Sequence, residues 1–69
     1  MNGPTQTAVQ ELRVALGMSI RQTARLAGVD HTYLARYERG QVVPSRHWLR
    51  RVARAMGAQV ARNHEESQP

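Results

Sequence analysis

Cysteine and lysine are absent from this sequence, and only Tyr33, Tyr37 and Trp48 are aromatic. Without thiols the chain forms neither disulfides nor thiolate metal sites, which is compatible with the cytoplasmic location that we predict. No long apolar run occurs, so we expect neither a signal peptide nor a membrane span. A glycine-rich phosphate loop is missing and the three histidines lack metal-ligand spacing. We therefore expect no enzyme, no metal site, no cofactor and no small-molecule ligand.

Acidic residues are scarce as well. The chain has five of them and ten arginines, which gives a formal net charge of +5. Arginine pairs bidentately with phosphates and with guanine edges, so a nucleic acid is the favoured partner. The few aromatic residues leave no evident stacking surface for RNA or single strands, and we favour double-stranded DNA. With 69 residues there is room for one domain with one small core.

Residues 20–40 have the spacing of two short helices joined by a tight turn. Ala24 supplies a side chain no larger than a methyl group, where two helices that cross at a steep angle must touch. Gly28 allows a left-handed turn four residues later, and Asp30 is a natural N-cap for the next helix. Leu34 can fill the wedge between the two helices. The pattern is typical of a helix-turn-helix, and the alternative is a helical hairpin without a role in DNA binding.

Apolar periodicity and capping residues predict an all-α fold of four to five short helices. The expected helices lie at about 5–16, 20–27, 31–39 and 46–56, and a glycine follows each of them. Thr7 with Gln10 and Ser19 with Gln22 resemble capping boxes at the starts of the first two helices, and Ser45 is the expected cap of the fourth. Residues 58–62 are expected to form either one turn of a fifth helix or a short strand. The predicted domain spans 5–61, between a flexible segment at 1–4 and a disordered tail at 62–69.

Short stretches in one register extend this pattern over about two thirds of the chain. They are Leu12-Arg13, Gly17-Met18-Ser19, Thr23-Ala24, Gly28-Val29, Glu38-Arg39-Gly40, Pro44-Ser45, Leu49 and Ala55-Met56-Gly57. In these stretches the sequence resembles the lambda-repressor-like family of XRE-type regulators and phage Cro proteins. Ile20 departs from the family, because many members carry a glutamine there that braces the reading helix and a phosphate. Thr23 replaces the usual leucine and Leu26 a polar residue, which predicts a shifted or reinforced apolar surface on the second helix.

The resemblance implies that the helix from His31 to Arg39 enters the major groove of DNA and reads base edges with its N-terminal part. The residues carried over as base readers are His31, Thr32 and Arg36. The residues expected to bind phosphates are Arg21, Tyr33, Arg39, Gln41, Ser45 and Arg46. Backbone amides at the helix starts add to this attraction. The alternative is that the three base readers only form an exposed, solvated face.

A structural role is assigned to Arg13, Ala24, Gly28, Leu34, Glu38 and Trp48. In the family, the glutamate at the position of Glu38 pairs with the arginine of the first helix, here Arg13. The resemblance therefore implies that this pair ties the reading helix to the scaffold. Trp48 shares an apolar stripe with Val52 and Met56, which favours a core position over a stacking platform.

Together these features predict a sequence-specific transcriptional regulator of the Cro or repressor type that occludes a promoter. One reading helix contacts too few base pairs to select a genomic site, so we expect a weak homodimer that assembles on a near-palindromic operator. The candidate contact surface between copies is the fourth helix together with residues 58–62. The alternative function is an antitoxin-like or other protein-interaction module that binds DNA secondarily.

Overall fold

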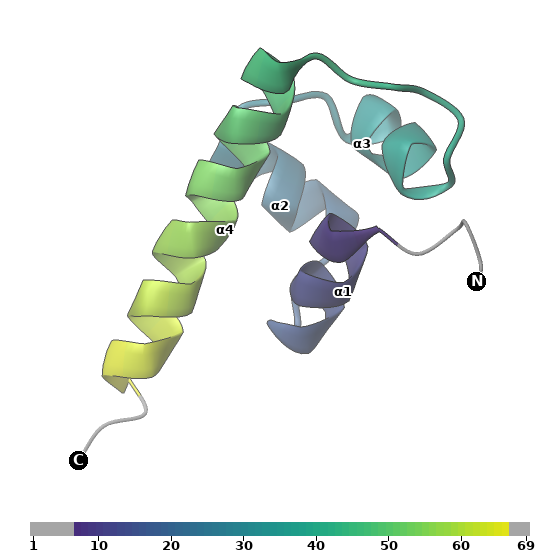
Figure 1. Cartoon of the computed structure of the whole chain (residues 1–69). Helices are drawn as coiled ribbons and strands as arrows, with labels where there is room; N and C mark the ends of the chain where they lie inside the picture. Colours follow the sequence, from purple (N-terminus) through teal and green to yellow (C-terminus); the bar gives the residue numbers. More distant parts are fainter. Residues whose placement is uncertain (1–6, 67–69) are drawn as a thin grey trace.

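The computed structural model describes residues 7–66, which form four α-helices and, over that range, no strand. The helices are α1 (Ala8–Ala15), α2 (Ile20–Ala27), α3 (His31–Glu38) and α4 (Arg46–Glu66). In Figure 1, α4 runs along one side of the molecule and the three shorter helices lie together on the other side. The predicted all-α class is confirmed.

A polar side chain caps the start of every helix. Each cap accepts a hydrogen bond from the backbone amide three residues later, at 2.9–3.1 Å, and satisfies one of the free amides of the first turn. The caps are Thr7, Ser19, Asp30 and Ser45. The Ser19 amide also donates to Gln22 Oε1 at 2.8 Å, which completes the predicted capping box of α2. The box predicted for Thr7 is only half formed, because Gln10 Oε1 is buried without a hydrogen-bond partner among residues 7–66.

Three of the four predicted glycine helix ends are present. Gly17, Gly28 and Gly40 all have a left-handed backbone, with φ between 70 and 76°, and they follow the first three helices. The prediction that Gly57 ends the fourth helix is wrong, because α4 continues to Glu66. Residues 58–62 are therefore neither a separate helix nor a strand.

Local interactions permit the continuation of α4 past Gly57. A glycine inside a helix costs only about 1 kcal/mol relative to alanine, and the alanines and arginine that follow Gly57 favour helix. The side chain of Gln59 donates to Asn63 Oδ1 at 2.9 Å, one turn further along. Residues 62–66, for which a disordered tail is predicted, thus belong to the helix. The predicted segment at 1–4 and the last three residues of the tail lie outside the described residues.

The core lies where α2 meets both α3 and α4. Leu34 and Val52 are fully buried, and Ala24 retains an exposure of 2% at the centre of α2. Thr23 is also fully buried, and its hydroxyl has no hydrogen-bond partner in the described part of the chain. Leu26 is instead 53% exposed. The prediction of a shifted or reinforced apolar surface on α2 is wrong, because the threonine takes the buried position and the leucine faces solvent.

Arg51 of α4 approaches the turn that follows α2. A Cβ atom at Gly28 would lie 2.7 Å from Arg51 Nη2, which is closer than such atoms can approach. The guanidinium thereby places a cation near the C-terminal end of α2, where the helix dipole favours positive charge. Gly28 is therefore required by its φ of 70°, whereas the flexible end of the exposed Arg51 side chain could move away from a Cβ atom.

Alanine substitutions at Gly28 and Gly57 should change stability in opposite directions. Gly28→Ala should lower the free energy of unfolding by about 1–2 kcal/mol, because it forces an L side chain into the left-handed region. Gly57→Ala should raise it by up to about 1 kcal/mol, because alanine favours helix and no atom lies within 4 Å of the new Cβ. Urea unfolding measures both changes. A destabilising Gly57→Ala would contradict a continuous α4.

Candidate nucleic-acid interface

α3 presents two faces of different character. Leu34 and Glu38 are buried on the face that packs against the rest of the domain. Thr32 and Arg36 are both exposed, and their spacing of four residues places them on one face of the helix. His31 is exposed beside Thr32 in the first turn. All three predicted base readers are therefore accessible on α3, as entry into a groove requires.

Trp48 connects the start of α4 to α3. Its ring lies edge-to-face with Tyr33 at a centroid distance of 5.2 Å and with Tyr37 at 5.5 Å. It is half-buried and packs against the core. Aromatic pairs in this geometry contribute about 0.5–1.5 kcal/mol beyond the area they bury. Tyr33, a predicted phosphate ligand, thus uses its ring to position α3, and only part of its side chain remains accessible.

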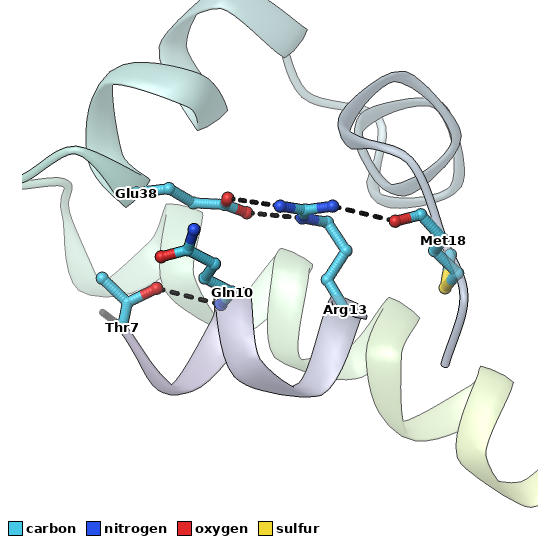
Figure 2. A network of polar contacts seen from close by, with 5 residues as sticks. All are labelled: Thr7, Gln10, Arg13, Met18 and Glu38. Carbon is cyan, nitrogen blue, oxygen red and sulfur yellow. Dashed lines mark hydrogen bonds and ion pairs between the residues drawn. The ribbon is translucent and has the colours of Figure 1, made fainter. Parts of the chain in front are cut away.

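A buried ion pair ties α3 to α1. Arg13 Nε and Nη2 donate to the two carboxylate oxygens of Glu38, both at 2.8 Å, and Nη1 donates to the Met18 carbonyl at 2.9 Å (Figure 2). The side chains are 12% and 3% exposed, respectively. Hydrogen bonding to Glu38 raises the pKa of the Arg13 guanidinium, so the cation keeps its charge. This is the pair that the family resemblance implies, and because its carboxylate faces Arg13, Glu38 adds no unpaired negative charge to the exposed face of α3.

Two arginines of α2 lie near the start of α3. Arg21 and Arg25 are exposed and line a hollow of about 280 Å³ together with Asp30 and His31. Arg21 is one of the predicted phosphate ligands, whereas Arg25 is missing from the predicted site. Its spacing of four residues from Arg21 on the same helix could have identified it.

The other predicted phosphate ligands lie after α3. Arg39 and Gln41 are exposed and line a hollow of about 470 Å³, which also contains Ile20 and the Arg13–Glu38 pair. Ser45 and Arg46 are exposed at the start of α4. Ser45 Oγ accepts the amide of Trp48 at 3.1 Å, which leaves its hydroxyl hydrogen free to donate. Side chains that could donate hydrogen bonds to DNA phosphates therefore lie beyond both ends of α3.

A family model described as a helix-turn-helix domain matches residues 7–65. The chain belongs to this helix-turn-helix family. No curated protein and no solved structure gives a match. The match extends over α1 to α4, and DNA binding is the function that a helix-turn-helix domain implies.

Two further findings concern residues 7–66 of the helix-turn-helix domain. Within this range, no group of three or more histidine, cysteine or acidic residues could hold a metal ion. None of the described helices is both long and apolar enough to cross a bilayer.

Removal of the buried carboxylate tests the scaffold of the helix-turn-helix domain. Glu38→Ala should lower the free energy of unfolding by up to about 3 kcal/mol, because it leaves the mostly buried Arg13 guanidinium without its carboxylate counter-ion and with only the Met18 carbonyl as a partner. Glu11→Ala is the matched control, since Glu11 is an exposed acid on α1 and its loss should change stability by less than about 0.5 kcal/mol. Equal effects in thermal or urea unfolding would show that the pair does not support the fold.

Proposed function

We propose that this helix-turn-helix protein is a sequence-specific, double-stranded-DNA-binding transcriptional regulator, a repressor of the Cro or XRE type that occludes a promoter. The observation that supports this function best is the exposed surface formed by His31, Thr32 and Arg36 on α3. The opposite face of the same helix is held by the core, by Trp48 and by the Arg13–Glu38 pair. A rigid helix with an exposed polar face suits entry into the major groove.

Each proposed base reader has a chemistry that fits base edges. Arg36 can donate two hydrogen bonds to guanine O6 and N7, the commonest specific contact in the major groove. Thr32 can offer its hydroxyl to a base or pack its methyl group against that of thymine. His31, in the first turn of α3, can donate or accept a hydrogen bond.

Phosphate contacts on both sides of the groove would set the register of α3. Arg21 and Arg25 lie beside the start of α3, and Arg39, Gln41, Ser45 and Arg46 follow its end. Such contacts position a protein on the duplex and carry no sequence information directly. The free amides at the start of α4 add attraction for a phosphate next to Arg46.

Selection of a genomic site calls for two copies of this domain. One reading helix contacts a few base pairs, whereas a genome offers about a million or more competing sites. Helix-turn-helix dimers solve this problem by reading two half-sites about 34 Å apart on a near-palindromic operator. The proposed regulator acts in the same way.

Substitution of two arginines separates base reading from phosphate binding. Arg36→Ala should weaken specific binding by about 1–3 kcal/mol and relax the preference at one base pair, whereas Arg46→Ala should weaken binding to all duplexes alike. Quantitative binding to a selected duplex and to random duplexes measures both effects. Equal losses on the two kinds of duplex for Arg36→Ala would remove this residue from the base readers.

The salt dependence of the affinity tests whether the protein binds double-stranded DNA through its phosphates. Log affinity should fall linearly with log salt concentration, with a slope of about −4 to −6 per protomer, since each neutralised phosphate contributes about −0.9. Single-stranded DNA and structured RNA serve as competitors and should displace the duplex poorly. A salt-independent affinity, or stronger competition by RNA, would contradict the proposed function and leave the protein-interaction alternative.

A further inference from the structure

The last turns of α4 project past the rest of the domain (Figure 1). No residue from 57 to 65 is buried, and Figure 1 shows the final turns of α4, in yellow, extending beyond the other three helices. Val60 lies in this part and is 42% exposed. Most helical stability in proteins comes from packing of an apolar face rather than from intrinsic propensity. A projecting helix that carries an exposed valine is therefore a candidate for contact with another surface.

An apolar groove lies next to this projecting part. It has a volume of about 260 Å³ and lies between α1 and α4. It is lined by Ala8, Val9, Leu12, Ala53, Met56 and Gly57, which are all apolar or lack a side chain. Leu12 is 38% exposed at this groove, and a Cβ atom added at Gly57 would meet nothing within 4 Å. A second helix can therefore approach α4 closely here, and none of the predicted DNA-binding residues lines the groove.

We propose that this groove binds the projecting end of α4 from a second copy of the chain, in an antiparallel arrangement with Val60 of each copy in the groove of the other. This proposal names the contact surface of the dimer and thus rests on the dimeric part of the proposed function. One two-fold axis generates both contacts, so the interface closes on itself.

Charge along α4 selects the antiparallel direction. Arg50 and Arg54 are exposed in its first half, and Glu65 is exposed near its end. These three residues, with Ala61, recur at spacings of four and seven, so they lie along one flank of the helix. The two-fold axis brings this flank of one copy against the same flank of the other. In a parallel arrangement the two copies of this flank would lie on opposite sides of the interface, and Arg50 would not meet Glu65.

The register follows from the position of the groove. The residues of α4 that line it are centred near position 55. In antiparallel helices of equal rise, a step towards the C-terminus of one matches an equal step towards the N-terminus of the other. Val60 level with position 55 therefore places Glu65 of one copy level with Arg50 of the second copy, twice per dimer.

Sedimentation equilibrium without DNA tests the pairing by exchange of charges. Arg50→Glu and Glu65→Arg should each raise the dimer dissociation constant about tenfold, because each puts like charges at both symmetric positions. An equimolar mixture of the two variants should recover wild-type association, since opposite charges then face each other at both positions of the mixed dimer. Val60→Gln should also weaken association, whereas Val14→Gln, at a position 62% exposed on α1 and outside the groove, should not. Circular dichroism checks that all variants are folded.

Three results would overturn the proposal: a chain that stays monomeric at the highest soluble concentration, a dimer that Val60→Gln does not weaken, or a mixture that shows no recovery. Binding of the Val60→Gln variant to a single half-site distinguishes failure of the proposed interface from failure of the proposed function. A variant that remains monomeric yet reads its half-site with wild-type specificity leaves DNA binding in place. A dimer that fails to distinguish specific from random duplex would contradict the proposed function and not the interface.

Discussion

The position of α3 depends on one buried ion pair. Arg13 has three side-chain nitrogens in hydrogen bonds, two to Glu38 and one to the Met18 carbonyl, so a single guanidinium joins α1, the turn before α2 and the end of α3. A pair of this kind does not need to add net stability, since desolvation of the two charges offsets much of their attraction. Its geometry is directional, however, and apolar contacts are not. The pair therefore orients α3, while burial of Leu34 in the core stabilises the packing of this helix.

Trp48 orients the same helix from the start of α4. It contacts Tyr33 and Tyr37, which lie one turn apart on α3, so a single ring of α4 packs against two successive turns of α3. Together with the ion pair, these contacts use the inward side of α3 and leave Thr32 and Arg36 exposed. The division between an anchored face and an exposed face is what makes α3 suitable for reading a groove.

Local chemistry made most of the helix boundaries predictable from the sequence. Capping by Ser19, Asp30 and Ser45 depends on hydrogen bonds to amides only three residues away, and the turns at Gly17, Gly28 and Gly40 depend on the φ of single residues. The exposure of His31, Thr32 and Arg36 follows from the same helical register. Their role in base reading rests on family resemblance and on the proposal above.

Tertiary structure decided what these local patterns left open. Gly57 and Gly28 are both glycines after an apolar run, yet one continues a helix and the other ends it. The difference is that the chain after Gly28 must turn so that α3 can pack against α2, whereas α4 after Gly57 is free to continue. Likewise the burial of Thr23 and the exposure of Leu26 follow from which side of α2 faces its neighbours. Residue type alone predicts the reverse, because hydrophobicity describes a side chain and burial describes its surroundings.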